Sequence, residues 1–286
     1  LSMAGIQVQA QGQVSADLQS EIEDGRIENV NATVRGQRLH LTGEALKGNR
    51  LATSQLNVRA NLTQSDEVLS FDELEVQTDW ASISATGRVP KTPQSLEKLL
   101  ESGTAYDLKG QFDVNLAALL SQMPNLIRVR EGMEITGGRA TGTVNTTTQD
   151  GRATIVAEAE VAGLAGTVDG EKVALSEPMQ TTLRLSADEE GAEVERLSLT
   201  TPFATVNASG DFEQIRYEVQ ATLAALQSEL GPFVDLGSYA LEGQVQSTGQ
   251  ISIGKQDVAA VGSLSTRQLV IADPDGNSVS ESAADM

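Results

Sequence analysis

Two stretches of this 286-residue chain repeat one another, and this duplication constrains the fold more than any other feature of the sequence. Residues 74–89 (LEVQTDWASISATGRV) match residues 197–212 (LSLTTPFATVNASGDF) without a gap, at an offset of 123 residues. A second pair of blocks, 115–124 (NLAALLSQMP) and 222–231 (TLAALQSELG), matches at an offset of 107 residues. The same offset of 107 relates two later positions in each copy, namely Gly142 and Val144 to Gly249 and Ile251. A supersecondary module used twice is typical of repeat arrays rather than of compact enzymes.

Apolar and polar residues alternate along most of the chain, for example over residues 56–62 and 215–221. Such a period of two indicates β-strands with one buried face. In the first copy of the repeat the apolar positions change from even to odd numbers near Asp79–Trp80, and Pro202–Phe203 marks the same place in the second copy. The chain must therefore reverse or bulge there, so both copies are predicted to be antiparallel hairpins within a meander.

Helices are predicted in only three short segments, at residues 92–103 and in the two Leu-Ala-Ala-Leu blocks that follow Asn115 and Thr222. The first has a Thr-Pro start and a Gly end, while Asn and Thr are good N-cap residues for the other two. Three short helices cannot cover the apolar face of so many strands. Because soluble monomers rarely expose large apolar patches, the sheet must curl on itself, pair with a second sheet, or shelter a guest.

The composition excludes several classes of function. The net charge is −20, with 40 acidic and 20 basic residues, so nucleic acid and anionic membrane surfaces are unfavourable partners. The absence of Cys excludes disulfides, thiolate catalysis and Cys-ligated metals. Aromatic residues make up only 3% of the chain, so the apolar material is thin and mainly aliphatic.

The chain reads as a piece of a longer protein. It contains no run of the roughly 20 apolar residues that a membrane span needs. Its first residues, Leu-Ser-Met-Ala-Gly, lack the basic and apolar regions of a signal peptide, so we expect any targeting segment to lie elsewhere. The last residues, 273–286, are polar and acidic, and we expect them to be a disordered tail.

Four patterns could carry chemistry, and each has a simpler explanation. His40, the one histidine, is the polar neighbour of two inward leucines in a predicted strand, which favours a surface position over a catalytic base. Residues 273–277 (DPDGN) have Gly fourth, whereas an EF-hand loop needs it sixth, which favours a plain turn. Residues 137–142 (GGRATG) have no following helix to bind phosphate, so we expect turn glycines. The carboxylates, as in residues 188–191 (DEEG), lie in turns or on polar faces, which makes a glycoside hydrolase the least favoured class.

The remaining candidate site is the aliphatic face itself. Each CH₂ group removed from water contributes about 0.8 kcal/mol, so an open apolar trough would bind lipid tails without any motif. Trp80 and Phe203, at equivalent turns, are predicted to be packing anchors at the rim of the sheet, with a gate for a guest as the alternative. The residues expected to line the trough are Leu56, Val58, Leu74, Val76, Ile83 and Ala85 in the first copy and Leu183, Leu185, Leu197, Leu199, Val206 and Ala208 in the second.

The module resembles the AsmA-like superfamily of bacterial envelope proteins, which includes the TamB-like proteins. In the first copy the resemblance lies in residues 113–124 (DVNLAALLSQMP) and 132–144 (GMEITGGRATGTV). In the second it lies in 223–226 (LAAL), 231–232 (GP) and 240–249 (ALEGQVQSTG). A short Leu/Ala helix, a Pro stop and a Gly-containing strand are characteristic of that family, and the similarity covers roughly residues 50–255.

The resemblance implies long, curled antiparallel sheets with an apolar interior that serve lipid traffic or outer-membrane assembly across the periplasm. Family members usually carry an N-terminal membrane anchor, so its absence here favours a piece of a longer, inner-membrane-tethered protein. The resemblance supplies no catalytic residue, metal ligand or cofactor.

Together these patterns predict an all-β protein with a few short helices, an elongated, curled antiparallel sheet that forms an open groove or taco-like shape. Residues 1–272 are expected to be one continuous β-groove with related modules at about 51–144 and 179–251, followed by the polar tail at 273–286. The predicted function is non-enzymatic, namely to hold lipid acyl chains for lipid transfer or outer-membrane assembly. Expected partners are those acyl chains and other segments of the same longer protein or other envelope proteins, without nucleic acid or cofactor. The alternative is a structural or adhesin-like repeat scaffold with a closed, dry β-sandwich core.

Overall fold

The computed structural model describes residues 2–3, 6–7, 9–23, 26–43, 49–65, 68–90, 107–123, 129–188, 191–211, 213–234, 236–237, 239–253, 258–273, 275 and 277–285. The predicted helix at 92–103 lies outside these residues. The chain forms two compact units: unit 1 is residues 1–128 and 138–153, and unit 2 is residues 129–137 and 154–286.

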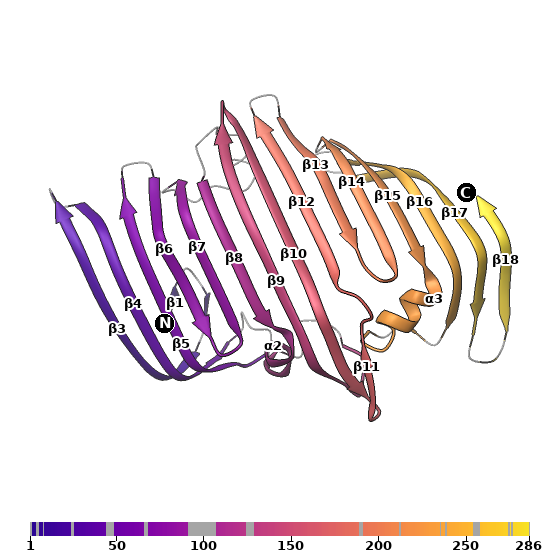
Figure 1. Ribbon diagram of the computed structural model, residues 1–286, viewed down its shortest axis with the longest axis horizontal. Coiled ribbons are helices and arrows are strands. Elements are labelled where there is room, and N and C mark those ends of the chain that lie inside the picture. Colours follow the sequence, from indigo (N-terminus) through magenta and orange to yellow (C-terminus); the bar gives the residue numbers. More distant parts are fainter. Residues whose placement is uncertain are drawn as a thin grey trace. The chain divides into compact units, whose positions relative to one another are not determined.

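Unit 1 is a meander in which each long strand pairs antiparallel with the next along the chain (Figure 1). Its strands are β3 (Gln9–Glu23), β4 (Arg26–Thr42), β5 (Leu51–Gln64), β6 (Val68–Thr78), β7 (Ala81–Pro90), β8 (Asp107–Asn115) and the greater part of β9 (Met133–Gln149). Helix α2 (Leu116–Gln122) follows β8 directly. The two short strands β1 (Ser2–Met3) and β2 (Ile6–Gln7) form a separate pair.

Unit 2 is a second antiparallel meander. Its strands are β10 (Arg152–Val168), β11 (Glu171–Ala174), β12 (Met179–Asp188), β13 (Gly191–Thr200), β14 (Ala204–Asp211), β15 (Gln214–Thr222), β16 (Ala240–Ile253), β17 (Val258–Ala272) and β18 (Ser278–Asp285). Helix α3 (Leu223–Ala225) follows β15 and continues as the π-helical turn η2 (Leu226–Leu230). Both short helices predicted after Asn115 and Thr222 are thus confirmed.

The strand order is an open path of a 16-stranded antiparallel sheet, with β3 and β18 as its end strands and β11 paired beside β10. In the described part of the chain these end strands do not pair with each other, so the sheet does not close. The predicted all-β fold, an open antiparallel sheet with a few short helices, is therefore confirmed.

The two copies of the repeated sequence also pair their strands in the same register. Val76 pairs with Ile83 in the hairpin β6–β7, and their counterparts Leu199 and Val206 pair in β13–β14. The equivalence extends one strand earlier than the sequence match indicated, because Leu62 pairs with Phe71 and Leu185 pairs with Val194 at the same offset of 123. Both strand pairs also have a register shift immediately before that leucine, so the local bulge is repeated as well.

A threonine hydroxyl fixes each hairpin turn. In the first copy Thr78 Oγ1 accepts hydrogen bonds from the backbone N–H groups of Trp80 (3.3 Å) and Ala81 (2.8 Å). Thr201 Oγ1 accepts from Phe203 (3.3 Å) and Ala204 (2.8 Å) in the second. Such side-chain to backbone bonds favour a turn over a continued strand, which explains the change in alternation at this place.

Each repeated block has a glycine two residues before its end, and the neighbouring strand leaves room for no other residue there. Gly87 and Gly210 have φ values of +133° and +139°, a region that other residues rarely adopt. A Cβ atom would lie 1.8 Å from the carbonyl oxygen of Asp107 at Gly87 and 2.2 Å from that of Gln214 at Gly210. The backbone of the next strand therefore passes too close for any side chain at these two positions.

The copies differ after their helices. Phe112 lies opposite Gly142, but Val219, its counterpart at the offset of 107, lies opposite Ser247 rather than Gly249. The sequence correspondence between Gly142 and Gly249 is thus displaced by two residues in the sheet. A slip of two residues keeps every side chain on its original face, so the apolar pattern survives it.

Two predictions about irregular segments are wrong. Residues 137–142, expected to be turn glycines, lie inside β9. Residues 278–285 of the expected disordered tail form β18, which pairs with β17. The hydrogen bonds of a β-ladder join backbone groups, so the outer edge of β17 can order a polar segment that has little apolar area to bury.

Candidate functional site

One face of unit 1 carries apolar side chains in rows that cross seven strands from β3 to β9. The strand register defines two adjacent rows: Ala16, Val34, Val58, Val76, Ile83, Phe112 and Gly142; and Leu18, Ala32, Ala60, Leu74, Ala85, Gly110 and Val144. The row between them belongs to the opposite face and is polar: Asp17, Thr33, Arg59, Glu75, Ser84, Gln111 and Thr143. Side chains in a strand alternate between faces, so the two chemistries are separated. We call the first the apolar face.

Unit 2 has an apolar face built in the same way over strands β12 to β17. Its rows are Thr181, Leu199, Val206, Val219, Ser247 and Leu264; and Leu183, Leu197, Ala208, Tyr217, Gly249 and Gly262. The intervening row is polar: Thr182, Ser198, Asn207, Glu218, Thr248 and Ser263. Each unit thus presents one aliphatic and one hydrophilic surface.

Few of these apolar side chains are covered. Among the described residues only eight apolar side chains are buried: Leu39, Leu120, Ala153, Leu175, Leu185, Ala187, Val194 and Phe233. Ile83, at the centre of a row, is 46% exposed. Phe112, in the same row, is 38% exposed, and most of the other apolar side chains in the rows of unit 1 are partly exposed. The rows therefore keep part of their apolar surface in contact with solvent.

The helices cover one end of the strands (Figure 1). In unit 1, Leu120 of α2 is buried, and the Gln122 side-chain carbonyl accepts a hydrogen bond of 2.6 Å from the backbone of Ala52. In unit 2, Phe233, which follows η2, is buried, and its carbonyl accepts a bond of 2.9 Å from the backbone of Arg130. Both helical segments close the turn end of their unit and leave the middle of the rows open.

All twelve predicted lining residues lie on the apolar faces, six in each unit. The register directly joins Leu74 to Ala85 in unit 1 and Leu197 to Ala208 in unit 2. Leu185 is buried and Ile83 is 46% exposed, whereas the other ten are partly exposed. The structure thus groups the predicted residues within each unit.

Several members of the rows, including Phe112 and Tyr217, were not among the predicted lining residues, although they alternate with polar neighbours in the sequence. Tyr217 lies across Gly249 and Gly262 on the next two strands. A Cβ atom at either glycine would come within 2.8 Å and 2.9 Å, respectively, of the Tyr217 hydroxyl oxygen. The phenol ring thus replaces two missing side chains, as aromatic residues commonly do beside glycine in a sheet.

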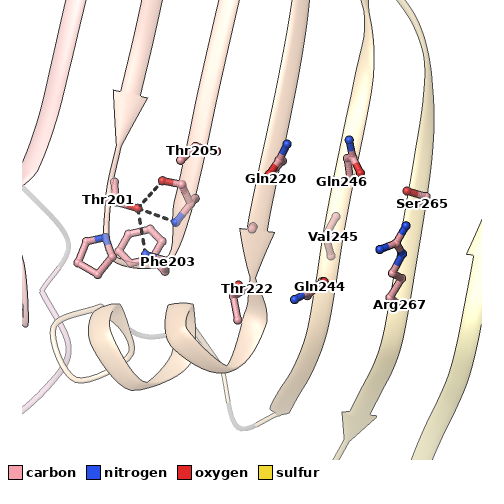
Figure 2. Close-up of a pocket in the computed structure, with 13 residues that line it drawn as sticks. Thr201, Phe203, Thr205, Gln220, Thr222, Gln244, Val245, Gln246, Ser265 and Arg267 are labelled. Carbon is pink, nitrogen blue, oxygen red and sulfur yellow. Dashed lines mark hydrogen bonds between the residues drawn. The ribbon is translucent and has the colours of Figure 1, made fainter.

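Each predicted rim residue lies at a small hollow on the polar face. Trp80 borders a hollow of about 380 Å³ in unit 1, and its indole N–H donates a bond of 3.2 Å to the Ala52 carbonyl. Phe203 borders a hollow of about 300 Å³ in unit 2, with Gln220, Gln246 and Arg267 among its other lining residues (Figure 2). Both residues therefore pack at the turn, beside polar side chains.

An ion pair lines the hollow of unit 1. The guanidinium of Arg139 donates to both carboxylate oxygens of Asp113, and this bond lowers the pKa of Asp113. Partial burial acts to raise the pKa of Asp79, but hydrogen bonds from Thr53 and Ser54 outweigh it and hold the pKa below its ordinary value. In unit 2 the counterpart of Asp113 is Gln220, so the ion pair is not repeated.

The other positions considered from the sequence are His40 and residues 273–277. His40 lies in β4 opposite Ala52 and Gln11, and among the described residues no group of His, Asp and Glu side chains could hold a metal ion. Both carboxylate oxygens of Asp273 accept hydrogen bonds of 2.8 Å from Asn277, as expected for a plain turn.

No helix in the described ranges has the length and apolar character needed to cross a bilayer. Comparisons with protein-family models, with curated proteins and with solved structures give no match to this chain. The resemblance to the AsmA-like superfamily therefore remains a prediction from the sequence pattern.

Proposed function

We propose that the apolar face of each unit holds lipid acyl chains, and that the protein transfers lipid or assists outer-membrane assembly in a bacterial envelope. The observation that carries this proposal is the set of mainly apolar rows without a covering layer in the described residues. Among the described residues, neither a second sheet nor the helices bury the middle of these rows. Ile83, in the middle of a row, is accordingly exposed. A hydrocarbon guest would remove these side chains from water.

The dimensions of the rows fit such a guest. Seven strands spaced about 4.8 Å apart give a row of roughly 29 Å in unit 1. One leaflet of a bilayer core is about 15 Å thick, half of the full hydrocarbon thickness, so one acyl chain fits along a row. At about 0.8 kcal/mol for each CH₂ buried, a 16-carbon chain gains on the order of 10 kcal/mol before entropy losses.

The proposed role is non-enzymatic and is located in the periplasm, with other segments of a longer, inner-membrane-tethered protein or other envelope proteins as partners. The separation of an aliphatic from a hydrophilic face supports this role, because a lipid carrier needs one surface for the tail and another for water. The rival role, a scaffold with a dry core, requires the same rows to be packed against protein. Their exposure supports the lipid carrier instead.

Site-specific photo-crosslinking tests the proposal. A photoreactive residue at Ile83 or Val206 is expected to capture phospholipid in cells, because both lie on the apolar face. The matched controls are the next residues, Ser84 and Asn207, which lie on the polar rows and should capture none. Native mass spectrometry of gently purified protein should show bound phospholipid. Absence of bound lipid, or equal crosslinking at all four positions, would support the dry scaffold.

Two substitutions test the same face in a second way. Ile83→Asp and Val206→Asp place a charge in the middle of a row, where desolvation by a lipid tail is costly. We expect lipid capture from neighbouring positions to fall by more than about tenfold while circular dichroism still shows the sheet, since a shift of 1.4 kcal/mol is tenfold in binding. Retained capture in a folded variant would count against the proposal.

A further inference from the structure

The two end strands of the sheet expose very different outer edges. Strand β3 is 15 residues long and β18 has 8 residues; among the described strands β3 pairs only with β4, and β18 only with β17. In an antiparallel ladder every second residue directs its N–H and C=O groups away from its partner strand. The outer edge of β3 is therefore a long row of backbone donors and acceptors that no described strand satisfies.

Strand β3 is only weakly protected as a terminal strand. Proteins blunt such edges with short strands, Pro, charged side chains or β-bulges. Residues 9–23 contain neither Pro nor Lys, and the register shifts of β3 lie near its two ends, at Gln11–Gln13 and Glu21–Ile22. The apolar rows of unit 1 end on this strand, where Val14 is 62% exposed and Leu18 is 67% exposed. By contrast β18 is short and consists of Ser, Ala, Glu and Asp apart from Val279. The regular central part of β3 therefore offers a longer and more apolar edge than β18 does.

The polar face of β3 indicates what charge its neighbour should carry. Asp17 lies opposite Thr33 and Glu21 lies opposite Asn29, so neither acid faces a cation on β4. Elsewhere this sheet pairs acids with arginines of adjacent strands, as between Arg59 and Glu75 at 2.9 Å. A strand on the free side of β3 with Lys or Arg at these levels would complete the same pattern.

We propose that the outer edge of β3 is a docking edge for an extended segment of a partner polypeptide, which pairs with it as an additional antiparallel strand. The segment alternates aliphatic side chains, aligned with Val14 and Leu18, with basic side chains that face Asp17 and Glu21. The backbone groups of the edge require a polypeptide in extended conformation, and the alternation sets which side chains it carries.

A second copy of this chain is a poor occupant. Two β3 strands paired antiparallel would place the acidic residues of one near those of the other, and like charges opposite each other destabilise a sheet. Strand β18 carries Glu281 and Asp285 and would be no better. The net charge of −20 opposes association of copies further.

A synthetic peptide tests the proposal. The probe has about 13 residues, which matches most of β3, and alternates Val with Thr, with two of the Thr positions, four residues apart, replaced by Lys. The peptide is expected to bind the whole chain and to slow hydrogen exchange of backbone amides in residues 9–23. A peptide with Glu in place of Lys should bind at least about tenfold more weakly. This inference does not depend on lipid binding, because hydrogen exchange reports the edge and not the apolar face.

Matched substitutions on the two end strands complete the test. Leu18→Lys places a charge on the edge at an already exposed position, so the fold should persist while peptide binding falls by at least about tenfold. Val279→Lys makes the same change on β18, where Val279 is 71% exposed, and should leave binding unchanged. The double variant Asp17→Lys, Glu21→Lys should prefer the Glu peptide. Protection at β18, no protection at either edge, equal binding of both peptides, or a dimer in sedimentation that excludes the peptide would each overturn the proposal.

Discussion

The two copies of the module place their side chains alike but bury them differently. Leu62 and Phe71 pair in unit 1 at the position where Leu185 and Val194 pair in unit 2. The pair in unit 2 is buried, whereas the pair in unit 1 is only half-buried. Backbone register therefore sets which residues meet, and the surroundings of each copy decide how much of that contact is hidden from water.

The hollows beside the two hairpin turns also differ in their polar side chains, although their turns are alike. Asp113 and Asn115 of unit 1 correspond to Gln220 and Thr222 of unit 2, and in register Arg139 corresponds to Gln244. The ion pair of one copy is thus a set of neutral amides in the other, although the turn and its threonine are the same. The turn is retained because it holds the backbone, while the residues around it vary.

The largest expected loss of stability comes from substituting Gly87 and Gly210, which lie in the second strand of each hairpin. Gly87→Ala and Gly210→Ala should each lower the free energy of unfolding by about 3 kcal/mol or more, because a Cβ atom would overlap a carbonyl oxygen of the next strand. Urea denaturation of each variant measures this effect. Similar losses in both would confirm that the copies share one backbone requirement.

Substitution of a third glycine tests whether the loss of stability comes from atomic overlap or from backbone strain. Gly191 has a similar φ of +145°, but a Cβ atom there would meet nothing within 4 Å. Gly191→Ala should therefore cost only about 1 kcal/mol, the strain alone. If it destabilised as much as the other two, the overlap with the neighbouring strand would not be the cause.

A smaller loss of stability is expected when the leucine at the repeated bulge, Leu62 in unit 1 or Leu185 in unit 2, is replaced by Ala. Leu185→Ala should cost about 3 kcal/mol, because it removes a buried side chain and leaves a cavity. Leu62→Ala removes the same atoms from a half-buried site, so we expect about half of that loss. Thermal or urea unfolding checks the ranking. Equal losses would show that Leu62 is covered in solution and would weaken the contrast between the units.

Much of this architecture follows from the sequence by simple rules. The alternation around residues 74–89 defines both faces, and the change of parity at Asp79–Trp80 locates the hairpin turn. The twelve residues predicted to line the trough were assigned to one face of each unit in this way, since a period of two assigns a residue to a face without knowledge of its neighbours. The Leu-Ala-Ala-Leu helices follow equally from composition and their N-terminal polar residues.

The parts that were not predicted depend on contacts between strands. Nothing local distinguishes a register of Phe112 opposite Gly142 from the two-residue slip of the second copy, because both keep the same faces. The polar segment 278–285 is ordered by the edge of β17 and not by its own composition. The glycines at 137–142 were assigned to a turn because a glycine inside a strand is explained only by what packs over it.

The smallest expected effect concerns Asp79, whose counterpart in unit 2 is Pro202. Its pKa lies below the ordinary value of 3.8 in the folded protein, because hydrogen bonds from Thr53 and Ser54 favour the carboxylate. The folded state therefore binds this proton less readily than the unfolded state. The stabilisation is present above the unfolded pKa and is lost as the pH falls through the folded pKa. Asp79→Asn should accordingly reduce stability slightly at neutral pH and flatten the pH profile below about pH 4. Chemical denaturation from pH 2 to 7 checks this, with the exposed Asp107→Asn as a control for the loss of one charge. If both variants gave the same profile, the carboxylate of Asp79 would not hold the first strand of the module against its turn, and that turn would rest on Thr78 alone, as the second copy rests on Thr201.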